Sequence, residues 1–332
     1  MLLEVKNLKT EFELRKGIVT AVNNVSFSVE KGEIVAIVGE SGSGKSVTSL
    51  SLMGLLRDPG KVTNGEIIFK DEDLREKSEK QMQQIRGNQI SMIFQEPMTS
   101  LNPVYRIKDQ IIESIRTHTD MSKPEALKRA IKMLELVGIP SPESRINDFP
   151  HQMSGGMRQR VMIAIALCCN PDLLIADEPT TALDVTIQAQ ILELISKLRD
   201  KMEMAVLLIT HDLGVVAETA DRVIVMYCGK IVEEAYVSDL FTSPKHPYTQ
   251  GLLESIPKMD DEKERLYMIK GMVPNPLEMP KGCAFSDRCE KCTEKCKENV
   301  PALTDIGGRK VRCFLYSNKA EEGFNERSFV GD

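Results

Sequence analysis

The distribution of apolar residues along the chain predicts an α/β fold. Three short runs, at 34–38, 173–176 and 205–209, are apolar throughout, as strands buried on both faces of a parallel sheet are. Segments with helical spacing of their apolar residues follow the first two runs, at 47–56 and 187–198. Strands that alternate with helices build a mostly parallel sheet covered by helices, so we expect an α/β core.

The first 34 residues follow a different pattern, in which strand-like runs alternate with turn signals. The runs lie at 2–5, 19–22 and 25–29, and the turn signals are Lys16-Gly17, Asn23-Asn24 and Lys31-Gly32. This pattern predicts an N-terminal antiparallel β layer, with Phe12 in its first loop. Taken by itself, Phe12 is best interpreted as a residue that packs in the core.

Three further segments complete the expected core. Strands are predicted at 65–69 and 90–94, and a hairpin is predicted at 222–233 around Cys228-Gly229. Between about residues 105 and 138 the apolar period becomes helical, which predicts an inserted helical subdomain at about 97–165.

Composition limits the functions that are open to the chain. Of 332 residues 42% are hydrophobic and 28% are charged, as in an ordinary globular protein. No uncharged apolar run approaches the ~18 residues of a membrane span, and the N-terminus lacks a signal-peptide pattern, so we expect a cytosolic protein. A net charge of −6 argues mildly against binding to nucleic acid.

The glycine-rich segment 39–46 predicts a phosphate-binding loop, because it lies between a predicted strand and a predicted helix. Glycines let several backbone N–H groups turn toward one anion, and the following helix adds the positive end of its dipole. Lys45 is placed to reach the β- and γ-phosphates of a nucleotide, and the Ser46 hydroxyl to hold Mg²⁺.

Other polar groups follow the core strands. Asp177 and Glu178 come at the end of the run 173–176, where they suit Mg²⁺ binding and activation of the attacking water. His211 follows the strand at 205–209, at the sheet edge where α/β proteins place their ligands. Ser154 with Gly155-Gly156 begins a helix at 157–169, and these residues fit an anion site and a plain helix cap equally well.

Taken together and in order, these motifs resemble the nucleotide-binding subunit of an ATP-binding-cassette (ABC) transporter. The resemblance covers about residues 2–234 and includes Gln95 and the segment 181–184. It implies a P-loop core with an antiparallel β layer and a helical subdomain, in an ABC ATPase domain at 1–236. The remaining residues, 237–332, would form a small metal-binding C-terminal extension.

The resemblance also implies roles for individual residues. Phe12 would stack on adenine, Gln95 would contact Mg²⁺ and water, and His211 would contact the γ-phosphate. The signature loop Ser154–Gly156 would bind ATP held by the opposite subunit, and Asp184 would line the dimer interface. Met157 stands where the family most often has Gln. The other residues expected to contact ATP are Gly39, Ser41, Gly42, Ser43, Gly44, Lys45, Ser46 and Val47, with Mg²⁺ held by Ser46, Gln95 and Asp177.

The segments 96–103 and 246–253 resemble the oligopeptide, dipeptide and nickel importers of this family. This likeness implies a peripheral subunit at the cytoplasmic face of the membrane. Its partners would be a second ATPase, in this branch a sister chain, two membrane permease subunits and an external substrate-binding protein. We expect import of di- or oligopeptides, with nickel as the alternative. A free-standing ABC ATPase acting on nucleic acid or ribosomes is disfavoured by the single cassette and the acidic charge.

Five cysteines crowd the C-terminal region, which in a reducing compartment indicates a metal rather than disulfides. Cys283, Cys289, Cys296 and Cys313 can hold a [4Fe–4S] cluster, and the same pattern occurs in the extension of the peptide-import branch. Cys292 is not used by this pattern, but it creates spacings to Cys289 and Cys296 that suit zinc. We favour the iron–sulfur cluster in a structural role and keep zinc as the alternative.

Overall fold

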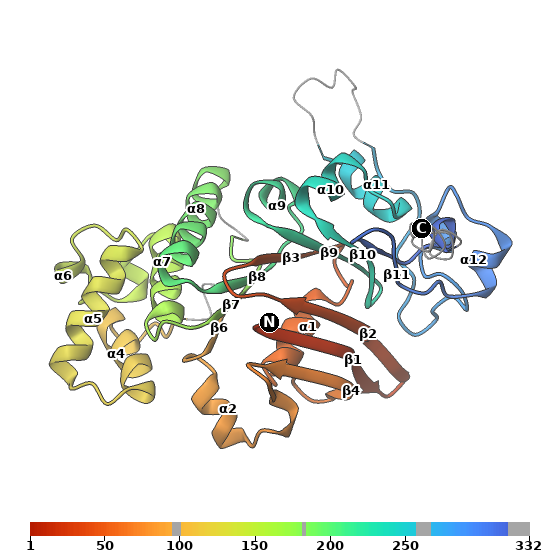
Figure 1. Ribbon diagram of the computed structural model, residues 1–332. Helices are drawn as coiled ribbons and strands as arrows, with labels where there is room; N and C mark the ends of the chain where they lie inside the picture. The colour runs from red at the N-terminus through yellow and green to blue at the C-terminus, as the bar shows by residue number, and fades with distance from the viewer. Residues whose placement is uncertain (95–100, 181–183, 257–266, 318–332) are drawn as a thin grey trace, which may run out of the picture. The chain divides into compact units, whose positions relative to one another are not determined.

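The computed structural model describes residues 1–94, 101–180, 184–256 and 267–317 (Figure 1). The chain forms two compact units that are each built from several segments. The first unit comprises Met1–Glu4, Ser28–Ile34 and Ile68–Thr210, and the second comprises Val5–Phe27, Val35–Ile67 and His211–Asp332. The P-loop segment and the C-terminal region therefore belong to the same unit.

The predicted antiparallel layer is present as long strands. β1 (Leu3–Leu14) lies between β2 (Gly17–Val29) and β4 (Gly60–Phe69), and the short β5 (Glu72–Asp73) pairs with the end of β4. The turn predicted at Asn23-Asn24 is wrong, because β2 continues through it. Asn24 has φ 56°, a left-handed conformation that Asn tolerates, and the buried side chains change register there, from Val22 to Val25. Phe12 lies in β1 rather than in a loop.

In the second unit β3 (Ile34–Val38) pairs in parallel with β9 (Arg222–Tyr227), which forms an antiparallel hairpin with β10 (Lys230–Tyr236). The predicted hairpin is confirmed, and its turn residues Cys228 and Gly229 have φ values of 44° and 75°. Beyond β10 the C-terminal region adds β12 (Lys310–Val311) and β11 (Thr304–Asp305). The extension thus continues the sheet that leads into the P-loop.

Helices and turns connect these strands. The α-helices are α1 (Lys45–Leu52), α9 (Leu213–Thr219), α10 (Val237–Thr242), α11 (Pro247–Glu254) and α12 (Glu294–Glu298), and the 3₁₀ helices are η3 (Ser286–Arg288) and η4 (Phe314–Tyr316). The helix predicted at 47–56 is shorter than expected, because Gly54 with φ 60° ends it. Tyr227, Tyr248 and Phe285 pack in one apolar core with residues of β3, β9 and α10.

In the first unit β6 (Ile90–Ile93), β7 (Leu173–Asp177) and β8 (Ala205–Ile209) form a parallel set, as predicted. The helices of this unit include a group between β6 and β7, in the range expected to be helical. Between β6 and β7 lie α4 (Ile107–His118), α5 (Lys123–Leu136), α6 (Pro142–Arg145), η2 (Pro150–Gln152) and α7 (Gly155–Leu167). The 3₁₀ helix η1 (Leu74–Glu76) and α2 (Glu79–Ile85) precede β6, and α8 (Val185–Met202) follows β7. Among the described residues, no helix has the length and apolar character needed to cross a membrane.

Candidate nucleotide site

The loop between β3 and α1 has a backbone that depends on glycine. Gly39, Gly42 and Gly44 have φ values of 150°, 78° and 102°. A Cβ atom at Gly39 would lie 2.2 Å from the carbonyl oxygen of Met226, and one at Gly44 would lie 2.5 Å from that of Ala21. The loop therefore follows a path that a side chain at these positions would block, as a phosphate cradle requires.

Lys45 is the first residue of α1 and is only 6% exposed. Its Nζ donates to the carbonyl oxygens of Gly39 and Glu40, at 2.7 and 3.1 Å. The backbone carbonyls of Gly39 and Glu40 thus hold the ammonium group inside the loop. Together with the N-terminus of α1, the ammonium group gives this loop the positive groups that the predicted anion site requires.

The loop is fixed to the β9–β10 turn. The Gly229 N–H donates to the Ser43 carbonyl at 2.9 Å, and the Asn23 N–H donates to the Gly229 carbonyl at 2.7 Å. The side chain of Thr48 donates to the Gly44 carbonyl at 2.9 Å and so closes the first turn of α1. These bonds join the loop to β2 and to the hairpin that continues into the C-terminal region.

The carboxylates predicted to hold Mg²⁺ and to activate the attacking water, Asp177 and Glu178, lie at the C-terminal end of β7 in the first unit. Asp177 is 4% exposed, and Glu178 follows it with φ 45°. The Glu178 N–H donates to the Ile209 carbonyl at 2.8 Å, which fixes this backbone beside the end of β8. A left-handed conformation is costly for a non-glycine residue and is concentrated at functional sites, so this geometry fits an active role for Glu178.

The predicted signature residues form the N-terminus of α7. Ser154 caps the helix, and its Oγ accepts from the Met157 N–H at 3.3 Å. Ser154 and Gly155 are exposed, and a Cβ at Gly156 would lie 3.2 Å from Cγ2 of Ile187. The 13-residue helix thus presents its positive end at the surface of the first unit.

One contact ties α7 to a neighbouring part of the predicted site, and a second contact caps α8. The buried Gln159 side chain donates to the Pro179 carbonyl, one residue after Glu178. Asp184 caps α8 and accepts from the Ile187 N–H at 2.9 Å. Gln159 could not be singled out from sequence patterns, because a polar residue inside a helix has no distinctive pattern.

The predicted ATP-site residues are divided between the two units. The P-loop, Phe12 and His211 belong to the second unit, whereas Asp177, Glu178, Ser154–Gly156 and Asp184 belong to the first. Phe12 is half-buried against Gly60, where a Cβ would lie 2.6 Å from the ring, and His211 is exposed. Gln95 and residues 181–183 lie outside the described residues. The composite ATP site thus stays a prediction.

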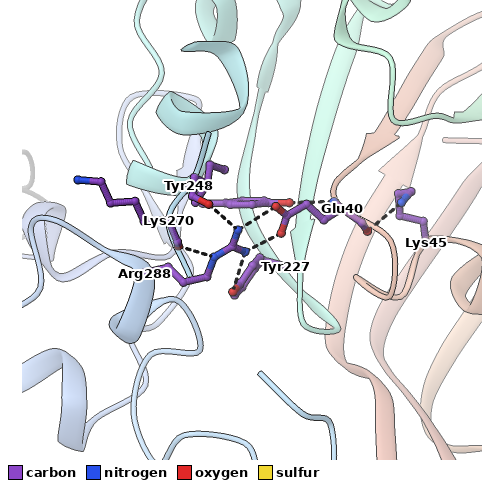
Figure 2. Close-up of polar contacts among 7 residues, drawn as sticks. Glu40, Lys45, Tyr227, Tyr248, Lys270 and Arg288 are labelled. Carbon is purple, nitrogen blue, oxygen red and sulfur yellow. Dashed lines mark hydrogen bonds and ion pairs between the residues drawn. The ribbon is translucent and has the colours of Figure 1, made fainter. Parts of the chain in front are cut away.

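The structure adds three residues to the neighbourhood of the P-loop. Glu40, the second residue of the loop, contacts Arg288 and also Tyr248 of α11 (Figure 2). Arg288 in turn contacts the hydroxyl of Tyr227 at the end of β9. Arg288 is distant in sequence from Glu40, and no periodicity relates the two positions, so sequence patterns could not pair them.

The four cysteines predicted to hold a cluster line one cavity of about 220 Å³, with His246 and Phe285 also in its wall. Cys292 is not among the residues lining that cavity. Burial raises the pKa of the Cys283 thiol to about 11 and also raises the pKa values of Cys289 and Cys313. Within the described part of the chain, no three His, Cys, Asp or Glu side chains are grouped as ligands of a single metal ion.

Sequence comparisons identify the relatives of this chain. The ABC transporter family matches residues 22–181, and the family described as oligopeptide/dipeptide transporter, C-terminal region, matches residues 232–296. The chain is 58% identical over 323 residues to the oligopeptide transport ATP-binding protein AppD of Bacillus subtilis (strain 168). That match covers 97% of this chain and 98% of AppD. It is 52% identical over 318 residues to the dipeptide transport ATP-binding protein DppD of Haemophilus influenzae, with 96% of each covered.

Solved structures agree with these sequence matches. The chain resembles the dimeric structure of MJ0796, a bacterial ABC transporter cassette, with a TM-score of 0.64 and 30% identity. The match covers 71% of this chain and 99% of that one. A post-hydrolysis state of MJ0796 bound to ADP and Pi matches with a TM-score of 0.63, 30% identity and the same coverage. The chain therefore belongs to the ABC transporter ATP-binding proteins, in the branch with the oligopeptide/dipeptide transporter C-terminal region, and is an ABC ATPase.

Proposed function

We propose that the chain is the ATP-hydrolysing subunit of a membrane importer and couples ATP hydrolysis to the uptake of di- or oligopeptides. The observation that carries this proposal is the match over nearly the whole length to relatives named for oligopeptide and dipeptide transport. The subunit would lie at the cytoplasmic face of the membrane. It would work with a sister ATPase, two permease subunits and an external substrate-binding protein.

In this proposal the second unit binds the phosphates. The backbone N–H groups of the glycine loop and the Lys45 ammonium hold the β- and γ-phosphates, and Phe12 stacks on the adenine. Ser46, Gln95 and Asp177 would hold Mg²⁺, which neutralises phosphate charge. Glu178 accepts a proton from the attacking water, and His211 contacts the γ-phosphate.

The exposed N-terminus of α7 supports hydrolysis at a dimer interface. Ser154 and Gly155 present helix-terminal N–H groups at the surface, where they can bind the γ-phosphate of ATP held by a second subunit. ATP then joins the two subunits, and hydrolysis removes the charge that bridges them. A permease bound to the dimer would be driven by its closing and opening.

Glu178→Gln tests the catalytic assignment. The variant should bind ATP with wild-type affinity and form an ATP-dependent dimer, while its turnover falls by about 10²–10⁴-fold because the general base is lost. Glu193→Gln is the matched control, since Glu193 lies in an exposed pair with Lys197 on α8. Wild-type turnover by Glu178→Gln would refute the role of Glu178.

The importer assignment is tested with the chain, its sister ATPase and the permease subunits reconstituted in vesicles with the binding protein. We expect ATP-dependent uptake of a labelled di- or oligopeptide that is abolished by Glu178→Gln. Peptide-independent ATP turnover combined with uptake of nickel would contradict the peptide assignment.

We further propose that Cys283, Cys289, Cys296 and Cys313 hold a [4Fe–4S] cluster. All four cysteines line the same cavity, whereas Cys292 does not. The cluster pattern likewise uses these four cysteines as ligands and leaves Cys292 out. A zinc site needs its ligand atoms within about 2.3 Å of one ion. A cubane instead takes one thiolate at each of four separated irons.

Metal analysis distinguishes the two alternatives. Anaerobically purified protein should be coloured, contain about four irons per chain and lose them when Cys313 is replaced by Ser. Cys292→Ser is the matched control and should retain its iron. A colourless protein that contains zinc would refute the cluster.

A further inference from the structure

The C-terminal region holds the phosphate-binding loop through one charged pair. Nη1 and Nη2 of Arg288 donate to the two carboxylate oxygens of Glu40, at 2.6 and 3.0 Å (Figure 2). The Arg288 side chain is 5% exposed and that of Glu40 is 29% exposed. This bidentate geometry is the strong form of an arginine–carboxylate pair, and its partial burial limits screening by salt.

Arg288 is itself held in place on the side away from Glu40. Its Nε donates to the Lys270 carbonyl at 3.1 Å, and Nη1 also donates to the Tyr227 hydroxyl at 3.3 Å. The guanidinium lies 5.8 Å from the ring centre of Tyr227 and 5.9 Å from that of Phe285. The guanidinium group is therefore oriented toward Glu40 before any nucleotide binds. A lysine at this position would not reproduce this bidentate, stacked geometry.

Glu40 joins this pair to the lysine that binds phosphate. Its N–H donates to the Tyr248 hydroxyl at 2.8 Å, and its carbonyl oxygen accepts from Lys45 Nζ at 3.1 Å. Tyr248 is fully buried, and its ring centre lies 4.6 Å from that of Tyr227. The side chain and N–H of Glu40 thus contact the C-terminal region, while its carbonyl contacts Lys45.

We propose that Arg288 is a positioning residue for ATP binding, which acts by neutralising Glu40 and by fixing the first turn of the phosphate loop. ATP carries several negative charges to a loop that already contains the Glu40 carboxylate. Without Arg288 that carboxylate would repel the phosphates and could also attract Lys45 away from them. The C-terminal region then forms part of the nucleotide site, an inference that rests on the proposed ATP binding but not on the transported substrate.

The test measures ATP affinity of the full chain directly, by titration with ATP and Mg²⁺. Arg288→Ala should weaken binding by about tenfold, equivalent to about 1.4 kcal/mol, and raise KM with little change in kcat. Arg288→Lys keeps the positive charge but not the bidentate guanidinium geometry, so we expect a smaller loss of ATP affinity. Lys297→Ala is the matched control, because it removes a cation of the same region that pairs with Glu294 at the surface.

A second substitution separates the charge effect from simple loss of structure. Adding Glu40→Gln to Arg288→Ala removes the unpaired carboxylate and should restore most of the ATP affinity. Affinity of Arg288→Ala within twofold of Lys297→Ala would overturn the proposal, and so would a double variant that binds no better than Arg288→Ala. If Arg288→Ala fails to fold, Arg288→Lys with and without Glu40→Gln gives the same comparison. Wild-type protein that does not bind ATP at all would instead refute the proposed function.

Discussion

Acidification should destabilise the second unit through His246, the residue that caps α11. The His246 side chain is 2% exposed, and its Nδ1 accepts from the Tyr248 N–H at 3.1 Å. Burial, together with the nearby Arg312 cation, lowers the pKa of His246 to about 3. The folded protein therefore keeps this imidazole neutral at pH values where an exposed histidine is protonated.

The magnitude follows from the two pKa values. Above an unfolded-state pKa of about 6.5 both states are neutral and His246 adds no pH dependence. As the pH falls below that value, the unfolded chain takes up a proton that the folded protein does not, and stability decreases by about 1.4 kcal/mol per pH unit. Between about pH 8 and about pH 5 the expected loss is about 2 kcal/mol.

The matched variant is His246→Asn, whose side-chain oxygen can accept the Tyr248 N–H as a helix cap but does not titrate. Glu233 titrates in the opposite sense: burial raises its pKa, so it takes up a proton first in the folded protein, and its contribution to stability increases as the pH falls. Glu233 accepts hydrogen bonds from the backbone N–H groups of residues 245 and 246, and the wild type and His246→Asn both keep these bonds. The difference between the two proteins therefore isolates His246.

The assay is urea unfolding followed by circular dichroism, at both pH values and at equal iron content. The wild type should lose about 2 kcal/mol more than His246→Asn on acidification. An equal loss in the two proteins would refute a buried, neutral His246. A larger loss in the variant would show that the imidazole is stabilised as a cation, which contradicts the burial argument.

Three further substitutions test the site. Gly44→Ala should lower ATP affinity by at least about tenfold, because its Cβ would lie 2.5 Å from the Ala21 carbonyl at φ 102°; unchanged nucleotide titration would contradict this. Gly282→Ala should reduce the iron bound per chain, since its Cβ would lie 2.2 Å from the Cys296 carbonyl, and full iron content would contradict it. Ser154→Ala should cost about 1 kcal/mol in thermal unfolding through the lost cap and should also lower turnover; full turnover would leave Ser154 as a cap alone.

The hydrophobic period predicted most of the regular structure because burial decides it locally. The runs at 34–38 and 205–209 became β3 and β8, and every residue in them is buried. The Asn23-Asn24 signal misled because one left-handed residue suffices to shift the register of a strand without ending it. Turn-forming residues therefore indicate where the backbone can deviate, and only the pairing of the neighbouring strands decides whether it turns.

The candidate site was predictable to the extent that its chemistry lies in contiguous motifs. The glycine loop, the carboxylates at the end of β7 and the cap of α7 are each recognisable from a few neighbouring residues. The spacing of the cysteines likewise picked out the four that line one cavity. Arg288 and Gln159 were not predictable, because each acts through a partner that only the tertiary fold brings near.

The position of Arg288 has a consequence for the cysteine cavity. Arg288 ends η3, which lies between Cys283 and Cys289, and Phe285 in the same segment packs against Tyr248 at 5.4 Å between ring centres. Any group held by the four thiols would fix both ends of the segment that presents Arg288 to Glu40. Linkage is reciprocal, so a group that orders this segment and so favours ATP binding must itself be held more tightly when ATP is bound. If the four thiols hold such a group and Arg288 positions the phosphate loop, the cavity and the loop would contribute to one binding equilibrium, although their residues lie far apart in the chain.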